Sequence, residues 1–231
     1  MDARRSIRFV VLLGAAVTMV FGAPGPAGAA SHAHNQNFAG YTIGDTPTTG
    51  TVSFTLPALT CTSTNAGIVP SLVFTNFTTN EFTSAGVYVQ CFGGVPDYAS
   101  LVEINNHFSF LTQTLNAGDK VRLNIAVTSK STTVTITDTT NHSAAKQSVS
   151  GPGGGGSFNG ATVGDNKIGS PGEPVAPFGT LEFTALKVNN SPLGAGGTLL
   201  PNDMYNGSTL QIRAGALSAT ATHFTTTFVH A

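Results

Sequence analysis

Apolar and polar residues alternate along much of this chain with a period of two. The clearest example is segment 120–128, where Val121, Leu123, Ile125 and Val127 occupy every second position. This period is that of a β-strand with one buried face. Short runs rich in Asn, Gly, Asp and Ser precede and follow the segment and indicate turns. The pattern therefore predicts an antiparallel meander that places the four apolar residues in a core.

Similar short segments recur from residue 51 to near residue 229, and we count ten or more of them. β-branched residues fill these segments, whereas the charged and amide residues that favour helices are scarce, with only 9% of the chain charged. Strands in such number, separated by turns, are typical of two packed sheets. The sequence predicts an all-β protein, a two-sheet antiparallel β-sandwich, with no internal domain boundary.

The segment 87–92 is a strand with two different faces. Apolar residues at positions 87, 89 and 91 form one face, and Tyr88, Gln90 and Phe92 form the other. An amide between two aromatic side chains is either a functional group or a polar filler satisfied by the backbone. Both interpretations of Gln90 stay open at this point.

The first thirty residues have the pattern of a signal peptide. A basic start precedes an apolar run of about fifteen residues, too short to span a membrane, and Ala27, Gly28 and Ala29 supply small residues for cleavage. We expect cleavage between Ala29 and Ala33, which leaves 31–231 as one secreted domain. After cleavage 7 basic and 10 acidic residues remain, a formal charge of about −3. The chain then has no membrane segment, and it lacks the basic character of nucleic-acid-binding proteins.

Two cysteines in an exported chain predict one disulfide, Cys61 to Cys91. Two separate buried thiols are the alternative. The six histidines are scattered without zinc-ligand spacing, so no metal and no cofactor are expected. Cleavage after Ala29 would place His32 third, and cleavage after Ala33 would make His34 terminal, and either could hold copper. The simpler interpretation is a polar leader without structure.

Four short motifs, in order along the chain, resemble one known family. The motifs are Asn37-Phe38-Ala39-Gly40, then Val89-Gln90-Cys91-Phe92 with Tyr98 and Val102-Glu103, then Ala117-Gly118-Asp119, and finally Pro177 to Phe183. From Asn37 to about Val188 the chain is similar to the glutamic peptidases, or eqolisins, which are secreted acid proteases. The resemblance implies their concanavalin A-like jelly roll.

The resemblance places Gln90 on the catalytic glutamine of that family, with Glu103 as a supporting acid within reach. It also implies that Phe38, Tyr88 and Phe92 line the binding groove. In these enzymes a glutamate acts as the general base, and the glutamine orients the attacking water and stabilises the oxyanion.

The general base is missing from this chain in the same comparison. The family's catalytic glutamate falls on Ala161, and its second acid falls on Asp165. The resemblance therefore implies an impaired enzyme that binds a peptide or a glycan, or that serves as a structural exported protein. The alternative is an active acid endopeptidase in which Asp165 or Glu173 replaces the glutamate. The sequence alone does not indicate an oligomeric state.

Overall fold

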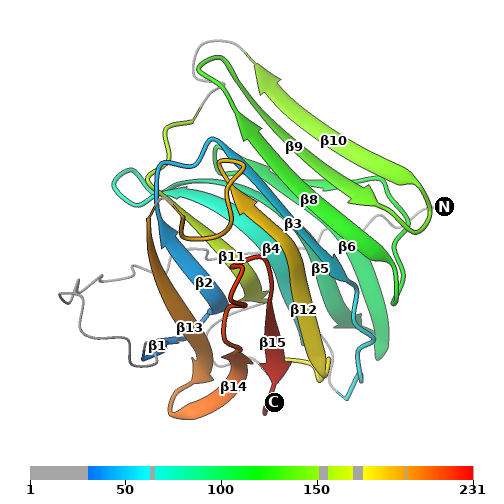
Figure 1. The fold of residues 1–231 in the computed structure, drawn as a ribbon. Helices are drawn as coiled ribbons and strands as arrows, with labels where there is room; N and C mark the ends of the chain where they lie inside the picture. Colours follow the sequence, from blue (N-terminus) through cyan, green and yellow to red (C-terminus); the bar gives the residue numbers. More distant parts are fainter. Residues whose placement is uncertain (1–30, 63–65, 151–155, 169–173, 196, 231) are drawn as a thin grey trace.

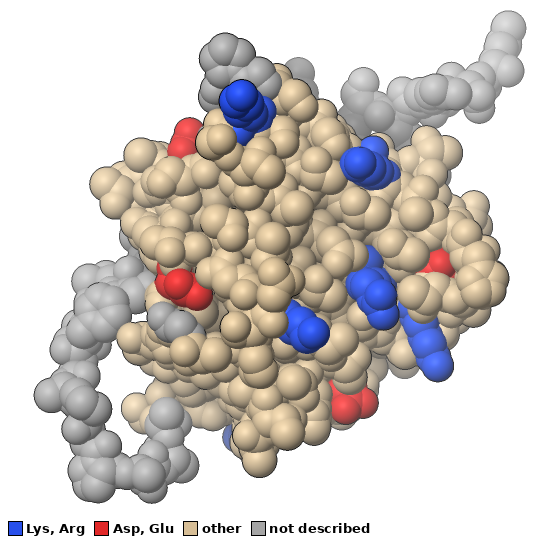
Figure 2. Space-filling model, turned by 45° about the horizontal axis from the view of Figure 1, so that its top comes forward, with Lys and Arg blue, Asp and Glu red and all other residues tan. Residues whose placement is uncertain are grey.

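The computed structural model describes residues 31–62, 66–150, 156–168, 174–195 and 197–230. Within these ranges the chain forms fifteen strands and no helix, so the prediction of an all-β fold is confirmed. No helix in this part of the chain is long and apolar enough to cross a membrane. The expected signal peptide, residues 1–30, lies outside the described residues. Charged side chains are few on the face that Figure 2 shows, in keeping with a chain of which only 9% is charged.

The strands vary from three to twelve residues. The first eight are β1 (Ala33–Asn35), β2 (Phe38–Gly44), β3 (Thr49–Thr55), β4 (Gly67–Asn76), β5 (Glu81–Phe92), β6 (Val95–Ile104), β7 (His107–Leu111) and β8 (Lys120–Val127). The others are β9 (Ser131–Asp138), β10 (Ser143–Ser150), β11 (Gly160–Lys167), β12 (Thr180–Val188), β13 (Thr198–Asn206), β14 (Thr209–Ala214) and β15 (Phe224–Phe228).

All fifteen strands belong to one hydrogen-bonded sheet that folds over itself into two layers (Figure 1). Its order is β10-β9-β8-β3-β12-β15-β14-β13-β2-β11-β4-β5-β6-β7, and β1 pairs with β13. Strands β8 and β9 contact β4, β5 and β6, so the two halves of the sheet face each other. This arrangement is the predicted two-layer sandwich. All pairs are antiparallel except β1 with β13.

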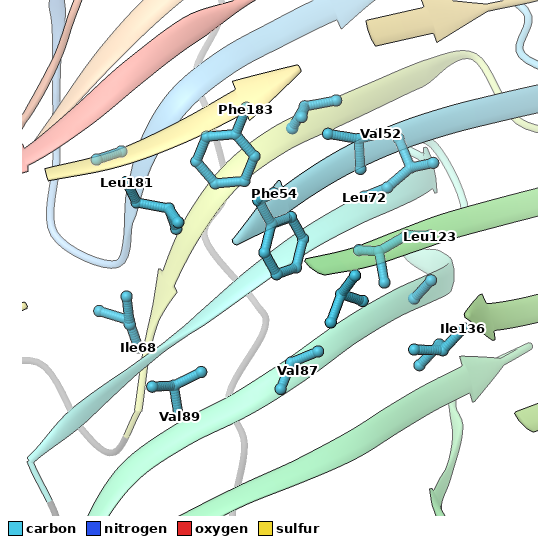
Figure 3. Packing of buried hydrophobic residues seen from close by; sticks show 14 of the residues in the cluster. Val52, Phe54, Ile68, Leu72, Val87, Val89, Leu123, Ile136, Leu181 and Phe183 are labelled. Atoms are coloured by element: carbon cyan, nitrogen blue, oxygen red, sulfur yellow. The ribbon is translucent and has the colours of Figure 1, made fainter. Parts of the chain in front are cut away.

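The core lies between the two layers (Figure 3). Val87 from β5 and Leu72 from β4 point toward Leu123 from β8 and Phe54 from β3. The ring of Phe54 meets that of Phe183 at 5.6 Å, edge to face. The alternation predicted for β8 is confirmed, because positions 121, 123, 125 and 127 belong to the core while Arg122 is exposed.

Two tight turns fix the register of β5, β6 and β7. Gly93 and Gly94 join β5 to β6 with φ values of 60° and 84°, and Asn105 and Asn106 join β6 to β7 with φ values of 52° and 63°. Two successive positive φ values are typical of the type I′ turn, which Gly and Asn adopt most readily. Each two-residue turn determines which residues lie opposite one another along the whole hairpin.

The predicted disulfide is confirmed. Cys61 and Cys91 are bonded, with their Cα atoms 5.4 Å apart. The bond joins the loop that precedes β4 to the end of β5, and Cys91 lies on the core side of that strand. The disulfide therefore lies on the other side of β5 from Gln90.

The polar segment after residue 30 is structured, so the expectation of a leader without structure is wrong. Strand β1 pairs with β13 in parallel. His32 Nδ1 donates to Asp203 Oδ1 at 2.8 Å, and the ring of His34 stacks on Tyr205 at 3.9 Å. Both histidines are therefore engaged with β13. No group of three or more His, Cys, Asp or Glu in the described part of the chain could hold a metal ion.

Candidate functional site

The two faces of β5 differ as the alternation predicts. Val87 and Val89 belong to the core, whereas Tyr88 and Gln90 lie on the side of the sheet that faces away from the opposite layer. We call this side of β2, β11, β4, β5, β6 and β7 the outer face. Its side chains are still well covered, since Gln90 is only 7% exposed. An amide in such a position requires a hydrogen-bonding partner.

The partner of Gln90 is Asp97, a residue that the sequence analysis missed. The turn through Gly93 and Gly94 places Asp97 of β6 directly opposite Gln90. Gln90 Nε2 donates to Asp97 Oδ2 at 3.2 Å. Counting outward from the two glycines would have identified the pair, because a two-residue hairpin fixes its own register. The structure therefore joins the amide to a carboxylate on the neighbouring strand.

Glu103 is not within reach of Gln90, and that expectation is wrong. The same register places Glu103 opposite Ser84, six residues from Gln90 along β5. At roughly 3.3 Å per residue, this separation is about 20 Å. Both residues lie on the outer face, but Tyr88 and Gly86 occupy the positions between them. Glu103 and Gln90 therefore belong to two different parts of that face.

The residues of the strands beside Glu103 in its row are uncharged. Glu103 is 3% exposed and Ser84 is 4% exposed, and in the same cross-strand row lie Val73 of β4 and Phe108 of β7. Burial raises the pKa of Glu103 to about 7, because the charged form loses its hydration. Glu103 Oε2 is buried and has no hydrogen-bond partner within the described residues. An unsatisfied buried carboxyl oxygen is rare in native structures.

Aromatic side chains form the outer face between these two positions. Tyr88 is 3% exposed, and its ring meets that of Phe110 of β7 edge to face at 5.9 Å. Burial raises the pKa of Tyr88 to about 12, so its hydroxyl stays neutral. Tyr88 also packs with Leu101 of β6. Phe108 and Phe110 are 42% and 54% exposed, which makes β7 an apolar border of the outer face.

The two other expected groove residues lie at the ends of this region. Phe38 begins β2 and is 6% exposed. Its ring lies over Gly40, where a Cβ atom would come within 3.0 Å of Phe38 Cζ. Phe92 ends β5 beside the glycine turn and is half-buried. Phe38 thus covers the part of the outer face near β2, and Phe92 borders the Gln90–Asp97 pair.

Strand β11 places Asp165 on the core side of the sheet, away from Gln90. Ala161 belongs to the core and pairs with Ile43 and Phe74. Asp165, four residues later, also points between the layers, where Thr226 donates to its Oδ2. Neither position faces Gln90. The expectation that Asp165 could replace the catalytic glutamate in the groove is wrong, and Glu173 lies outside the described residues.

The residues that β11 presents on the outer face are Thr162, Gly164 and Asn166. Asn166 Nδ2 donates to Ser71 Oγ of β4 at 2.7 Å. Ser71 lies on the outer face, so Asn166 lies there too. Thr162 lies in the same cross-strand row as Glu103. None of the three is ionisable, so β11 contributes no general base to the outer face.

Burial also raises the pKa of Asp165. This side chain is fully buried, and burial raises the pKa of the carboxyl to about 7, an effect that the hydrogen bond from Thr226 only partly offsets. Asp165 Oδ1 has no partner in the described part of the chain. Lys167, on the same side of β11, donates to Gln211 Oε1 at 3.0 Å. Asp165 is therefore an unusual buried acid in the core and not a group of the outer face.

A separate hollow of about 420 Å³ lies between the loop at 112–116 and the turn at 141–144. Gln113 spans it by accepting from Ser100 Oγ and donating to Ser143 Oγ. Its lining contains no ionisable side chain. The hollow therefore has hydrogen-bonding groups but no acid or base, and the candidate site remains the outer face.

Solved structures with the same fold include glutamic peptidases. Scytalido-glutamic peptidase, crystallised with a peptide-based transition-state analogue, is 17% identical, with a TM-score of 0.65 over 84% of this chain and 98% of that chain. SCP-B, an eqolisin crystallised with the tripeptide Ala-Ile-His, is also 17% identical, with a TM-score of 0.62 over the same shares of the two chains. Aspergilloglutamic peptidase from Aspergillus niger is 18% identical, with a TM-score of 0.54 over 71% of this chain and 99% of that chain.

These identities are low, so the three structures establish the fold and not the chemistry of this chain. No curated protein sequence shows significant similarity to the chain. The model of the peptidase A4 family matches residues 36–225, which is most of the chain and includes β2 through β14. The chain belongs to the peptidase A4 family.

Proposed function

We propose that this protein binds extended peptides on its outer face and does not hydrolyse them at the rate of an active glutamic peptidase. The observation that carries the proposal is the direction of β11, whose outer-face residues Thr162, Gly164 and Asn166 include no carboxylate. Loss of a general base typically lowers the rate about 10²- to 10⁴-fold.

The contact between Gln90 and Asp97 supports the same conclusion. Hydrolysis of the glutamic type needs an attacking water between the amide and the carboxylate. Here the two groups bond directly at 3.2 Å, which leaves no space for a water between them. Asp97 is also exposed, and it belongs to the strand next to Gln90 and not to a strand across the face.

The aromatic surface supports peptide binding. Tyr88, Phe108 and Phe110 lie together on the outer face, and two of the three are substantially exposed. Ligand-binding sites are lined mainly by hydrophobic and aromatic side chains with a small number of polar groups among them. Two solved relatives of the same fold were crystallised with peptide ligands.

The test is an incubation of the purified mature protein with denatured casein from about pH 2 to pH 7, together with equilibrium binding of blocked peptides. We expect binding without release of acid-soluble fragments. Acid proteolysis that Gln90→Ala or Asp97→Asn abolishes would refute the proposal and identify those two residues as a catalytic pair. Absence of peptide binding at every pH would favour a structural role instead.

We also propose that the protein acts outside the cell. The Cys61–Cys91 disulfide and the family are in keeping with an oxidising, extracellular environment. Strand β1 begins at Ala33, so cleavage after Ala29 would leave the contacts of His32 and His34 with β13 intact. The intact mass of the exported protein measures the cleavage point, and a mass that includes Met1 would contradict this proposal.

A further inference from the structure

Glu103 is the one carboxyl on the outer face that lacks a hydrogen-bonding partner among the described residues. It is 3% exposed, and its Oε2 is buried and unsatisfied. A buried polar group without a partner raises the free energy of the folded protein. The unsatisfied oxygen lies on β6 opposite Phe108 of β7, whose ring is exposed. A ligand that supplies the missing partner would recover the lost energy.

No charge in the described part of the chain faces this carboxyl. Its neighbours across the strands are Ser84 of β5 and Phe108 of β7, and the same row continues to Val73 of β4 and Thr162 of β11. The nearest acid on its own strand and face is Asp97, six residues away. Two further titratable residues, Tyr88 on the outer face and His107 near Glu103 in sequence, do not place a charge beside the carboxyl.

The first of these groups is Tyr88, which lies two cross-strand rows away and whose phenol stays neutral. The second is His107, which precedes Phe108 and pairs with the core residue Ile104, so its side chain leaves β7 on the opposite side. Burial among uncharged neighbours therefore favours the protonated carboxylic acid, which can donate a hydrogen bond as well as accept one.

Strand β7 supplies a second observation that points to a ligand. It is the last strand of the sheet on that side, so one edge of its backbone has no partner strand within the described residues. Phe108 and Phe110 are two residues apart and project from the same face, next to Glu103 and Leu101 respectively. An exposed sheet edge is a common binding place for extended peptides, and pockets beside it for alternate side chains give specificity.

We propose that Glu103 and Ser84 hold the main chain of a bound extended peptide, and that Phe108 and Phe110 take an apolar side chain of the same peptide. This inference rests on the proposed function and names the part of the outer face that performs it. Glu103 donates to a main-chain carbonyl of the peptide, and Ser84 hydrogen-bonds to the adjacent amide. An apolar residue follows from the chemistry of β7, which offers two phenyl rings and no charge on this side.

Binding of this kind depends on the proton of Glu103. The pKa of this carboxyl is about 7, so below that pH the free protein carries the donor, and above it the donor is lost. Affinity is therefore highest in acid and falls as the pH rises through 7. For one required proton the expected loss between pH 5 and pH 8 is about tenfold.

The experiment measures peptide binding by calorimetry from pH 4 to pH 8. The probe is an acetylated and amidated heptapeptide with a central Phe, and a second peptide with a central Ser is the matched ligand control. The proteins are the wild type, Glu103→Gln, Phe110→Ser and, as a matched control on the opposite layer, Glu182→Gln. Circular dichroism at each pH confirms that every variant is folded.

We expect the wild type and Glu182→Gln to lose about tenfold in affinity between pH 5 and pH 8. Glu103→Gln keeps a donor at all pH values, so its affinity should stay within about threefold across the range. Phe110→Ser should weaken the Phe peptide about tenfold and leave the Ser peptide unchanged.

Two results would overturn the inference while leaving the proposed function standing. One is a pH dependence in Glu103→Gln equal to that of the wild type. The other is equal affinity of the wild type for the Phe and Ser peptides. If the wild type binds neither peptide at any pH, the proposed function itself fails.

Discussion

Substitution of Asp165 by Asn should remove much of the pH dependence of folding stability. Asp165 is fully buried between the layers, with one hydrogen bond from Thr226 and one oxygen, Oδ1, without a partner in the described residues. Burial raises the pKa of the carboxyl from 3.8 to about 7. The folded protein therefore holds a proton on Asp165 that the unfolded chain has released over this range.

The sign and size of the effect follow from this difference. A pKa that is raised on folding contributes stability that is fully present below the unfolded value, near pH 4, and that is lost as the pH rises to about 7. A change from 3.8 to about 7 corresponds to about 4 kcal/mol. Small domains are stable by only about 5–15 kcal/mol, so the wild type should be much weaker at pH 8 than at pH 4.

Urea denaturation at pH 4, 6 and 8 measures the effect, with circular dichroism as the signal because the chain has no Trp. The new amide leaves its Nδ2 without an acceptor, which costs about 1–3 kcal/mol at every pH. The informative quantity is therefore the loss of unfolding free energy between pH 4 and pH 8. This loss should be smaller in Asp165→Asn than in the wild type by about 4 kcal/mol. Glu182→Gln, an exposed position on β12, should keep the wild-type slope. If Asp165→Asn and the wild type lose equal stability with pH, the assignment of the buried proton to Asp165 is wrong.

Two further predictions concern the disulfide and the second hairpin turn. Replacing both Cys61 and Cys91 by Ala opens a loop of 30 residues and should lower the free energy of unfolding by about 3.5 kcal/mol, measured by urea denaturation of the exported proteins; a loss under about 1 kcal/mol would contradict the chain-entropy argument. Asn106 has a φ of 63°, and its side chain accepts from Phe82 N and donates to Asn80 O, so Asn106→Ala and Asn106→Gly lose the same two hydrogen bonds. Asn106→Ala should destabilise the fold by about 1–2 kcal/mol more than Asn106→Gly in urea denaturation, and equal losses would show that the backbone conformation contributes nothing.

Local patterns were sufficient to predict the strands and the faces of most of them. The alternation in β8 and β5 separates core from outer residues because the period of a strand is two and one layer covers one side. The disulfide was predictable because the chain has two cysteines and the pattern of an exported protein. These features depend only on nearby residues or on composition.

The arrangement of the site was less predictable, because it depends on register between strands. The motif similarity placed Ala161 at a catalytic position, but the period of two assigns Ala161 and Val163 to the core side of β11. Asp165 continues that row as a buried acid, which runs against the usual exposure of aspartate and could not be inferred from the sequence. Glu103 was placed beside Gln90 by motif order, although the turn at Gly93 and Gly94 already separates them by six residues.

The two acids with raised pKa values should act independently of each other. Glu103 lies on the outer face of β6, and Asp165 lies on the core face of β11, with β4 and β5 between the two strands. Three strand spacings separate them by about 14 Å across the sheet, and Asp165 lies a further three residues along β11 from the row of Glu103. Residues further apart than about 10 Å without shared partners usually add within about 0.5 kcal/mol. The raised pKa of Glu103, from 4.5 to about 7, corresponds to about 3 kcal/mol of stability lost between pH 4 and pH 8. The double variant Glu103→Gln with Asp165→Asn should therefore lose less stability between pH 4 and pH 8 than the wild type by about 7 kcal/mol, the sum of the two single changes. A deviation from additivity above about 1 kcal/mol in urea denaturation would show that Glu103 on the outer face and Asp165 in the core are energetically coupled, and would contradict their independence.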